Sequence, residues 1–188
     1  MSKYANLYEV HKEVRGCTKC PLHQTRKNTV FGEGNVHADI MLIGEGPGRD
    51  EDELGRPFVG EAGQLLDKML AAIDLTRNDV YIGNILKCRP PGNRDPKPEE
   101  AYECIGYLRA QVAMIRPKIL VCLGRVASGY LLQRNVRITK ERGIWQEVKG
   151  FYIMPTYHPA ALLRNEGWKK DSYADLLKIR AKYDELKG

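Results

Sequence analysis

The sequence predicts an α/β fold in which helices cover both faces of a mainly parallel sheet. Three observations predict it. Short, continuous apolar runs such as "DIMLIG" and "KILVCLG" are typical of strands buried on both faces. Segments with apolar residues at helical spacing lie between these runs. Alternation of the two patterns along one chain is typical of parallel strands joined by crossover helices.

The first half of the chain supplies two of the strands. Apolar residues at helical spacing predict a helix over residues 4–15, and residues 17–38 have the composition of a loop. The run "ADIMLIG" predicts a buried strand that leads into a glycine-rich turn. Residues 64–75 repeat apolar side chains with the period of a helix, and "DVYIGNIL" predicts the second strand.

The second half begins with the segment "CRPPGNRDPKP", in which four prolines exclude regular structure. Pro98, followed by two glutamates, suits the first turn of a helix that runs to about Ile115. The remaining elements are, in chain order, a strand at "KILVCLG", a helix over residues 125–133, strands at "IWQEV" and "FYIMPT" on either side of a turn at Lys149-Gly150, and a charged helix over residues 172–186.

Length and composition are those of one globular domain, which we place over residues 1–188. Hydrophobic residues make up 43% of the chain and charged residues 29%. No charged start leads into an apolar run, and no apolar run is long enough to span a bilayer. We therefore expect a cytoplasmic monomer that does not bind membranes. The net charge of +6 favours a polyanionic partner.

Three of the predicted strands are followed by side chains that carry chemistry. In parallel sheets ligands bind beyond the carboxyl ends of the strands, so these positions form the candidate site. Phe58, in the glycine-rich segment, is either a stacking platform or an anchor of its loop. Asn84 can read the edge of a nucleobase or cap the backbone. His158 follows the last strand and is either catalytic or structural.

The glycine-rich turn "GEGPG" is neither of two common nucleotide-binding motifs. It lacks the Gly-Lys-Ser/Thr sequence of a P-loop, and Pro47 breaks the spacing of the dinucleotide fingerprint. Its glycines let the backbone approach a ligand closely. The alternative is a tight turn from strand to helix, followed by a solvated acidic run.

Two kinds of segment suit contacts with DNA. Leucines beside a cation are typical of wedges that open a base stack, although a helix with its leucines inward has the same pattern. The segments "KCRPPGNRDPK" and "RNVRITKER" are basic, which suits phosphate contacts or a solvated surface. The candidate DNA-contacting residues are Leu162, Leu163, Arg164, Arg94, Arg137 and Lys140.

Four of the five cysteines are candidates for a thiolate metal site. Cys17 and Cys20 form a Cys-x-x-Cys pair, and Cys88 and Cys104 lie far along the chain. Without a secretion signal, metal binding is favoured over disulfides. The spacing favours zinc and an iron–sulfur cluster about equally. Cys122 lies inside an apolar strand and is predicted to be a core thiol.

Four motifs in this order resemble the iron–sulfur uracil-DNA glycosylases of family 4. They are "GEGPGRDED", "GRPFVG", "NILKCRPPGNRDP" and "YHPAALLRN", accompanied by the four spaced cysteines. The match runs from Cys17 to about Asn165. The resemblance implies a three-layer α/β/α sandwich with a central four-stranded parallel sheet. It also implies base excision repair: uracil is flipped out of single- or double-stranded DNA and its N-glycosidic bond is hydrolysed, which leaves an abasic site.

The resemblance also implies a role for each site residue. Phe58 would stack on uracil, Asn84 would bond its polar edge, and His158 would stand by O2. Glu45 would place or activate the water and would line the pocket with Gly46, which stands where the family-1 enzymes carry a water-activating Asp. Glu51 would crowd the position of a thymine methyl group.

The same resemblance implies that the four cysteines hold a structural [4Fe-4S] cluster, with zinc as the alternative. The cluster would tie the N-terminal loop to the rest of the domain. Two other classes of function fit parts of the sequence: a DNA-binding or redox module that uses the cluster, and a metal-stabilised enzyme of free nucleotides. A redox carrier does not need Phe58, Asn84 and His158 together at three strand ends, and an enzyme of nucleotides would need a phosphate cradle.

Overall fold

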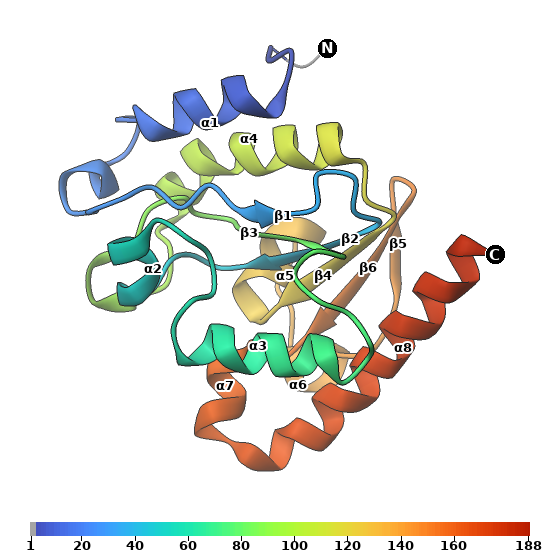
Figure 1. Cartoon of the computed structure of the whole chain (residues 1–188). Helices are drawn as coiled ribbons and strands as arrows, with labels where there is room; N and C mark the ends of the chain where they lie inside the picture. Colours follow the sequence, from blue (N-terminus) through green and yellow to red (C-terminus); the bar gives the residue numbers. More distant parts are fainter. Residues whose placement is uncertain (1–2) are drawn as a thin grey trace.

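The protein is described by a computed structural model over residues 3–188, which has the predicted α/β fold. At its centre is one sheet of six strands in the order β1-β3-β2-β4-β6-β5 (Figure 1). The strands are β1 (Glu33–Gly34), β2 (Ile40–Gly44), β3 (Tyr81–Asn84), β4 (Ile119–Leu123), β5 (Gln146–Val148) and β6 (Phe151–Thr156). Strands β3, β2, β4 and β6 are parallel, which confirms the expected four-stranded core. Strands β1 and β5 lie at the two edges of the sheet, and each is antiparallel to its neighbour.

Different helices cover the two faces of the sheet. They are α1 (Leu7–Arg15), α2 (Arg49–Leu54), α3 (Glu61–Ala71), α4 (Pro98–Ile115), α5 (Arg125–Leu132), α6 (Ile138–Glu141), α7 (Pro159–Arg164) and α8 (Lys169–Lys187). In β2, Met41 and Ile43 join a core with α1, α4 and α5, whereas Ile40 and Leu42 join a core with α3 and α8. Successive strand residues point to opposite faces, so one apolar run supplies both cores and the domain has three layers (Figure 1).

Most element boundaries lie close to their predicted positions. Helix α4 has the predicted range: Glu100 accepts a hydrogen bond from the Lys97 N–H at 2.9 Å, and Arg116 ends the helix in the left-handed conformation. Helices α3 and α8 both begin three residues before the predicted start, because their first turns are mostly polar and lack the apolar period. The prediction of a loop over residues 17–38 was wrong in part, since Pro21–Gln24 forms a 3₁₀ turn and β1 also lies there. Within residues 3–188 no helix has the length and apolar content that crossing a bilayer requires.

A buried ion pair secures the end of β6 against α8. Asp175 is fully buried and accepts two hydrogen bonds from the Arg142 guanidinium, at 2.5 and 2.8 Å, and one from the Thr156 hydroxyl at 2.7 Å. Gly143 lies so close that a Cβ there would approach the Asp175 carboxylate to 2.2 Å. Because His158 comes two residues after Thr156, this contact fixes the strand end from which the histidine projects.

Candidate active site

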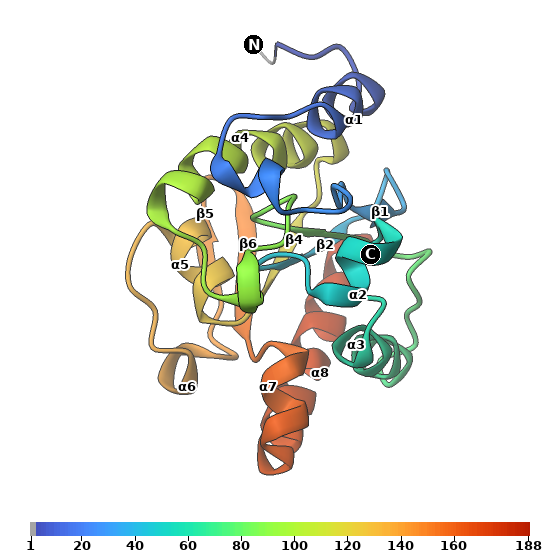
Figure 2. The same ribbon diagram turned by 90° about the vertical axis from the view of Figure 1, so that its left-hand side faces the viewer.

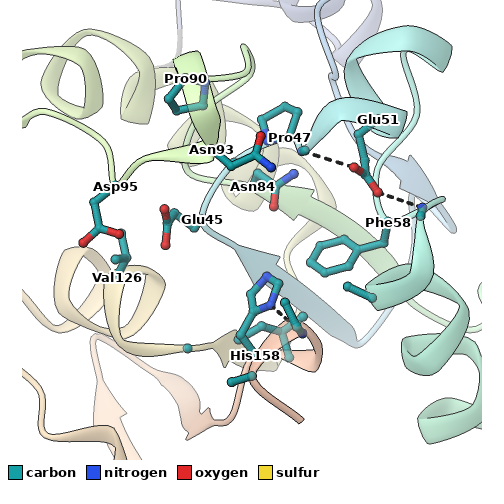
Figure 3. Close-up of a pocket in the computed structure, with 18 of the residues that line it drawn as sticks. Glu45, Pro47, Glu51, Phe58, Asn84, Pro90, Asn93, Asp95, Val126 and His158 are labelled. Carbon is teal, nitrogen blue, oxygen red and sulfur yellow. Dashed lines mark hydrogen bonds between the residues drawn. The ribbon is translucent and has the colours of Figure 1, made fainter. Parts of the chain in front are cut away.

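A cavity of about 780 Å³ lies where the four parallel strands end. Helices α2 and α7, which follow β2 and β6, lie at this end of the molecule and face the viewer in Figure 2. The cavity wall includes Glu45 after β2, Asn84 at the end of β3, Gly124 after β4 and His158 after β6. The structure therefore brings the residues after the strands together, as the topology predicted (Figure 3).

Asn84 is the buried polar residue of this wall. Its side chain is almost inaccessible, with 2% of the residue exposed, and within residues 3–188 its Oδ1 has no hydrogen-bond partner. The side chain lies across Gly44 of the neighbouring strand, where a Cβ would approach Oδ1 to 2.4 Å. A buried acceptor without a donor costs about 1–3 kcal/mol. Such a group is retained in a cavity when a ligand supplies the donor.

Phe58 is held in a strained backbone conformation at φ 51°. Arg77 donates hydrogen bonds to the carbonyls of Pro57, at 3.0 Å, and of Phe58. Gly63 packs against the same carbonyl, so that a Cβ there would come within 1.8 Å of the Phe58 oxygen. The phenyl ring is thereby fixed 5.6 Å from the His158 ring, with 31° between their planes (Figure 3). A ring with its orientation set in advance is suited to stacking on a planar ligand.

Glu51 connects two loops of the wall. Its carboxylate accepts backbone hydrogen bonds from Gly48 at 3.1 Å and from Val59 and Gly60 at 2.9 Å each (Figure 3). It therefore ties the glycine-rich turn to the segment that carries Phe58. The sequence did not predict these bonds, because two of the three partners, Val59 and Gly60, come from the loop that follows α2. The idea that Glu51 also crowds a methyl group stays a prediction.

His158 is held as one tautomer of the neutral imidazole. The Ala160 N–H donates to its Nδ1 at 3.1 Å, so the proton of the neutral ring is on Nε2. Burial, and then the nearby Arg164, lower the pKa of His158 to about 4, while Glu51 acts in the opposite direction. At neutral pH the residue is consequently an uncharged hydrogen-bond donor at the cavity wall (Figure 3).

Glu45 has the pKa of a group that can exchange protons at neutral pH. Burial and the charge of Asp95 raise its pKa to about 7, and Arg125 opposes the shift. Arg125 forms an ion pair with Asp95 at 2.5 Å on the same wall. The sequence predicted neither residue as part of the site. Arg125 could have been found, since it directly follows the third predicted strand, and Asp95 could have been found as the single acid of a basic loop.

The candidate DNA-contacting residues differ in whether they are exposed to a ligand. Leu162 is 1% exposed and packs in the core with α3 and α8, so the expectation that it could act as a wedge was wrong. Leu163 is 42% exposed. Arg94 forms an ion pair with Glu100 at 2.7 Å, so its guanidinium is not available for a phosphate contact unless that pair opens. The exposed cations among the candidates are Arg164, Arg137 and Lys140.

The four candidate cysteines line one small pocket away from the active-site cavity. None of the chain's five cysteines, which all lie within residues 3–188, forms a disulfide. The fifth, Cys122, is buried in β4 as predicted. Arg26 donates to the Cys88 Sγ at 3.2 Å, and the Lys87 N–H donates to the Cys104 Sγ at 3.2 Å. Among residues 3–188 no group of three or more His, Cys, Asp and Glu side chains has the arrangement that holds a single metal ion. Four cysteines around one pocket nevertheless match the four thiolate ligands of an iron–sulfur cluster. The N–H groups that donate to the sulfurs of Cys88 and Cys104 are the kind of hydrogen bond that supports such ligands.

Comparison with known proteins identifies the family. The model of the uracil DNA glycosylase superfamily matches residues 31–179. The chain is 46% identical to the type-4 uracil-DNA glycosylase of Archaeoglobus fulgidus, with 93% of this chain and 92% of the relative covered. It is 48% identical to the Thermotoga maritima type-4 enzyme, with 83% and 82% covered. A type-5 uracil-DNA glycosylase of Pyrobaculum aerophilum is 32% identical, with 80% and 81% covered. The chain therefore belongs to the uracil-DNA glycosylase superfamily and, within it, to the type-4 uracil-DNA glycosylases.

Proposed function

We propose that this chain is a uracil-DNA glycosylase of base excision repair, which hydrolyses the N-glycosidic bond of uracil in DNA and leaves an abasic site. The observation that carries the proposal is the set of three side chains around one cavity: the unpaired Asn84 Oδ1, the oriented Phe58 ring and the neutral His158. A base buried in a stacked duplex cannot reach them, so uracil must be flipped out, at a cost of a few kcal/mol.

Asn84 supplies the selectivity for uracil. Uracil presents a donor at N3–H and an acceptor at O4, and an amide side chain presents the complementary acceptor and donor. The buried Oδ1 would accept from N3–H, which provides the donor that it otherwise lacks. Cytosine has an acceptor at N3 and a donor at N4, so it would leave the same oxygen unpaired. The ring of Phe58 would stack on the flipped base.

His158 stabilises the departing base. When the bond between the sugar C1′ and uracil N1 breaks, its electron pair goes to uracil and negative charge develops on O2. The Nε2–H of the neutral imidazole would donate to this oxygen, and the Ala160 N–H holds the ring in the required tautomer. A donor at the atom where charge develops contributes about 3–4 kcal/mol to lowering the barrier.

Glu45 activates the water that replaces uracil. As C1′ becomes oxocarbenium-like, a water oxygen bonds to it and one proton passes to the Glu45 carboxylate. The nearby Arg125 favours the ionised carboxylate, whereas burial and Asp95 disfavour it. The balance leaves a base of the strength suited to neutral pH.

Activity should consequently rise with pH through the pKa of Glu45. The pKa of about 7 lies above the usual value, so the group is protonated and inactive below pH 7 and ionised above it. We expect kcat at pH 8 to be about tenfold that at pH 6, in proportion to the ionised fraction. Single-turnover rates across this range measure the effect. Glu45→Gln should abolish the rise, and a variant that kept the same profile would exclude Glu45 as the base.

Leu163, rather than Leu162, is the proposed wedge. Leu163→Ala should lower turnover on duplex DNA about tenfold and leave single-stranded DNA and the Tm almost unchanged, because it removes only support for the opened stack. Leu162→Ala should instead lower the stability by about 2–5 kcal/mol, since it leaves a cavity in the core. Assays on both substrates and thermal unfolding of both variants compare the two roles. Equal losses on duplex and single strand for Leu163→Ala would contradict the assignment.

The four cysteines Cys17, Cys20, Cys88 and Cys104 would hold a [4Fe-4S] cluster. When bound, the cluster supplies metal–thiolate bonds that tie the N-terminal loop to the segment that begins α4. Burial raises the pKa of Cys104 to about 12, so its thiol ionises only against a cationic centre. Iron, sulfide and zinc analysis of the purified protein distinguishes the cluster from the zinc alternative. The cytoplasmic location, the single domain and the monomeric state stay predictions.

The function is tested with an oligonucleotide that contains one uracil. Incubation with the protein followed by alkali should cut the strand at that position, and a matched oligonucleotide with thymine or cytosine should remain intact. The substrates are U·G and U·A duplexes and the single strand. Absence of cleavage in all three would overturn the proposal.

A further inference from the structure

A second cavity, a groove of about 880 Å³ between α4 and α5, adjoins the active-site cavity. The two share the wall residues Asp95, Arg125 and Val126. Helices α4 and α5 lie side by side on the same face of the sheet (Figure 1, Figure 2). The groove therefore begins at the edge of the catalytic cavity and continues along the outside of the helical layer.

One side of the groove carries an exposed aromatic ring and a free cation. Tyr102, Ile105 and Arg109 lie on one face of α4, because they are spaced at helical intervals. Tyr102 is 80% exposed, so its ring is accessible from the groove. Within residues 3–188 the Arg109 side chain forms no hydrogen bond or ion pair. Both groups are thus available to a ligand.

The rest of the groove holds two arginines that are each paired with an acid, a second aromatic ring and apolar side chains. Arg125 and Arg134 lie in the wall with Arg109, and Asp95, the acid that the described residues contribute to this wall, is paired with Arg125. Arg134 pairs with Glu141 at 2.6 Å outside the groove. The half-buried Tyr130 adds a second ring. Apolar surface is supplied by Pro96, Pro98, Ala101, Ile105, Val126 and Val136.

We propose that this groove binds single-stranded DNA next to the flipped uracil, an inference that rests on the proposed function. A DNA strand whose uracil occupies the catalytic cavity must leave that cavity through its edge, and the groove begins there. Aromatic rings in a positively charged channel bind single strands by stacking on the bases and pairing with phosphates. A duplex keeps its bases stacked on each other and offers the tyrosines no ring to contact. The occupant is therefore the unpaired strand.

The test compares Tyr102→Ala and Arg109→Ala with Tyr8→Ala. Tyr8 is a matched control, since it is 75% exposed on α1 and lies outside the groove. The substrates are a single strand with a central uracil, single strands with the uracil near the 5′ or the 3′ end, and the duplex. Tyr102→Ala should raise KM for the central single strand about tenfold, as expected for loss of one stacked base. The change in KM for the duplex should be within about twofold.

Two further readouts make the test specific. Arg109→Ala should reduce the slope of log KM against log salt for the single strand by about 0.7, as expected for one lost phosphate contact. The effect of Tyr102→Ala should also disappear when the strand ends before it reaches the groove, which occurs for only one of the two terminal substrates. Tyr8→Ala should behave as wild type throughout.

The proposal would be overturned by an equal rise in KM for duplex and single strand. It would also be overturned by an unchanged KM for every substrate, because the strand would then not contact the groove. If the wild-type chain releases no uracil, the proposed function fails but the groove is still tested. In that case fluorescence anisotropy with a uracil-free single strand should show weaker binding by Tyr102→Ala than by Tyr8→Ala.

Discussion

Replacing His158 by alanine is expected to lower kcat on uracil-containing DNA by about 100- to 1,000-fold, with KM changed by less than about threefold. The reason is that charge develops on uracil O2 only as the glycosidic bond breaks, so the donor acts in the transition state and not in the bound complex. The loss corresponds to about 3–4 kcal/mol. Single-turnover rates and DNA affinity, measured on the same preparation, separate the two effects.

The expected pH dependence of this variant adds a second check. Because the pKa of His158 is lowered to about 4, the imidazole is neutral throughout the range in which Glu45 titrates. His158→Ala should therefore lower the rate at every pH from 6 to 8 by the same factor and leave the midpoint near 7. His37→Ala is the control, since His37 is exposed and lies outside the cavity. A large rise in KM at constant kcat would contradict the transition-state role.

Replacing Cys88 by alanine should remove the proposed metal centre and lower Tm by about 10–20 °C. One thiolate of four would be lost, and the remaining three would no longer tie the N-terminal loop to α4. Metal–thiolate bonds form only in the folded chain, so their loss is a loss of folding free energy. A loss of about 5 kcal/mol shifts Tm by about 10–20 °C in a domain of this size. Iron content and thermal unfolding measure the two consequences.

The Cys122→Ala variant provides the matched control. Cys122 is as deeply buried as any cysteine of the chain, but it lies in β4 and away from the pocket of the other four. Its replacement should cost some packing energy and leave the iron content unchanged. The segment after Cys88 also supplies Arg89, Asn93 and Asp95 to the active-site cavity. Cys88→Ala should therefore raise KM as well, whereas full iron content and an unchanged Tm would exclude the structural role.

Elements with a strong apolar period were predicted well. Helix α4 and strand β6 have the predicted ranges because a helix and a buried strand each repeat one local pattern over several residues. The glycine-rich turn, Asn84 and His158 were placed at strand ends for the same reason. The very short β1 was missed, since its two residues pair only with β3 and carry no pattern of their own.

Contacts between distant segments were not predictable. The sequence suggested both Leu162 and Leu163 as wedges, and only the packing of α7 on α3 and α8 decides that Leu163 is exposed. The same holds for Glu51, whose partners lie across a loop, and for Arg77, which holds Phe58 from a turn 19 residues away. Each of these contacts joins residues whose separation is set by the fold, not by local spacing.

The sequence by itself determined the α/β class, the parallel core and the chemical groups at the strand ends, because periodicity and turn chemistry are local properties of a chain. Only the tertiary structure decided the state of those groups. Burial sets the pKa of Glu45 near 7 and of His158 near 4, and close packing on Gly44 isolates the Asn84 oxygen. These properties depend on desolvation and on neighbours that folding brings together from distant segments. A local stretch of sequence therefore does not predict them.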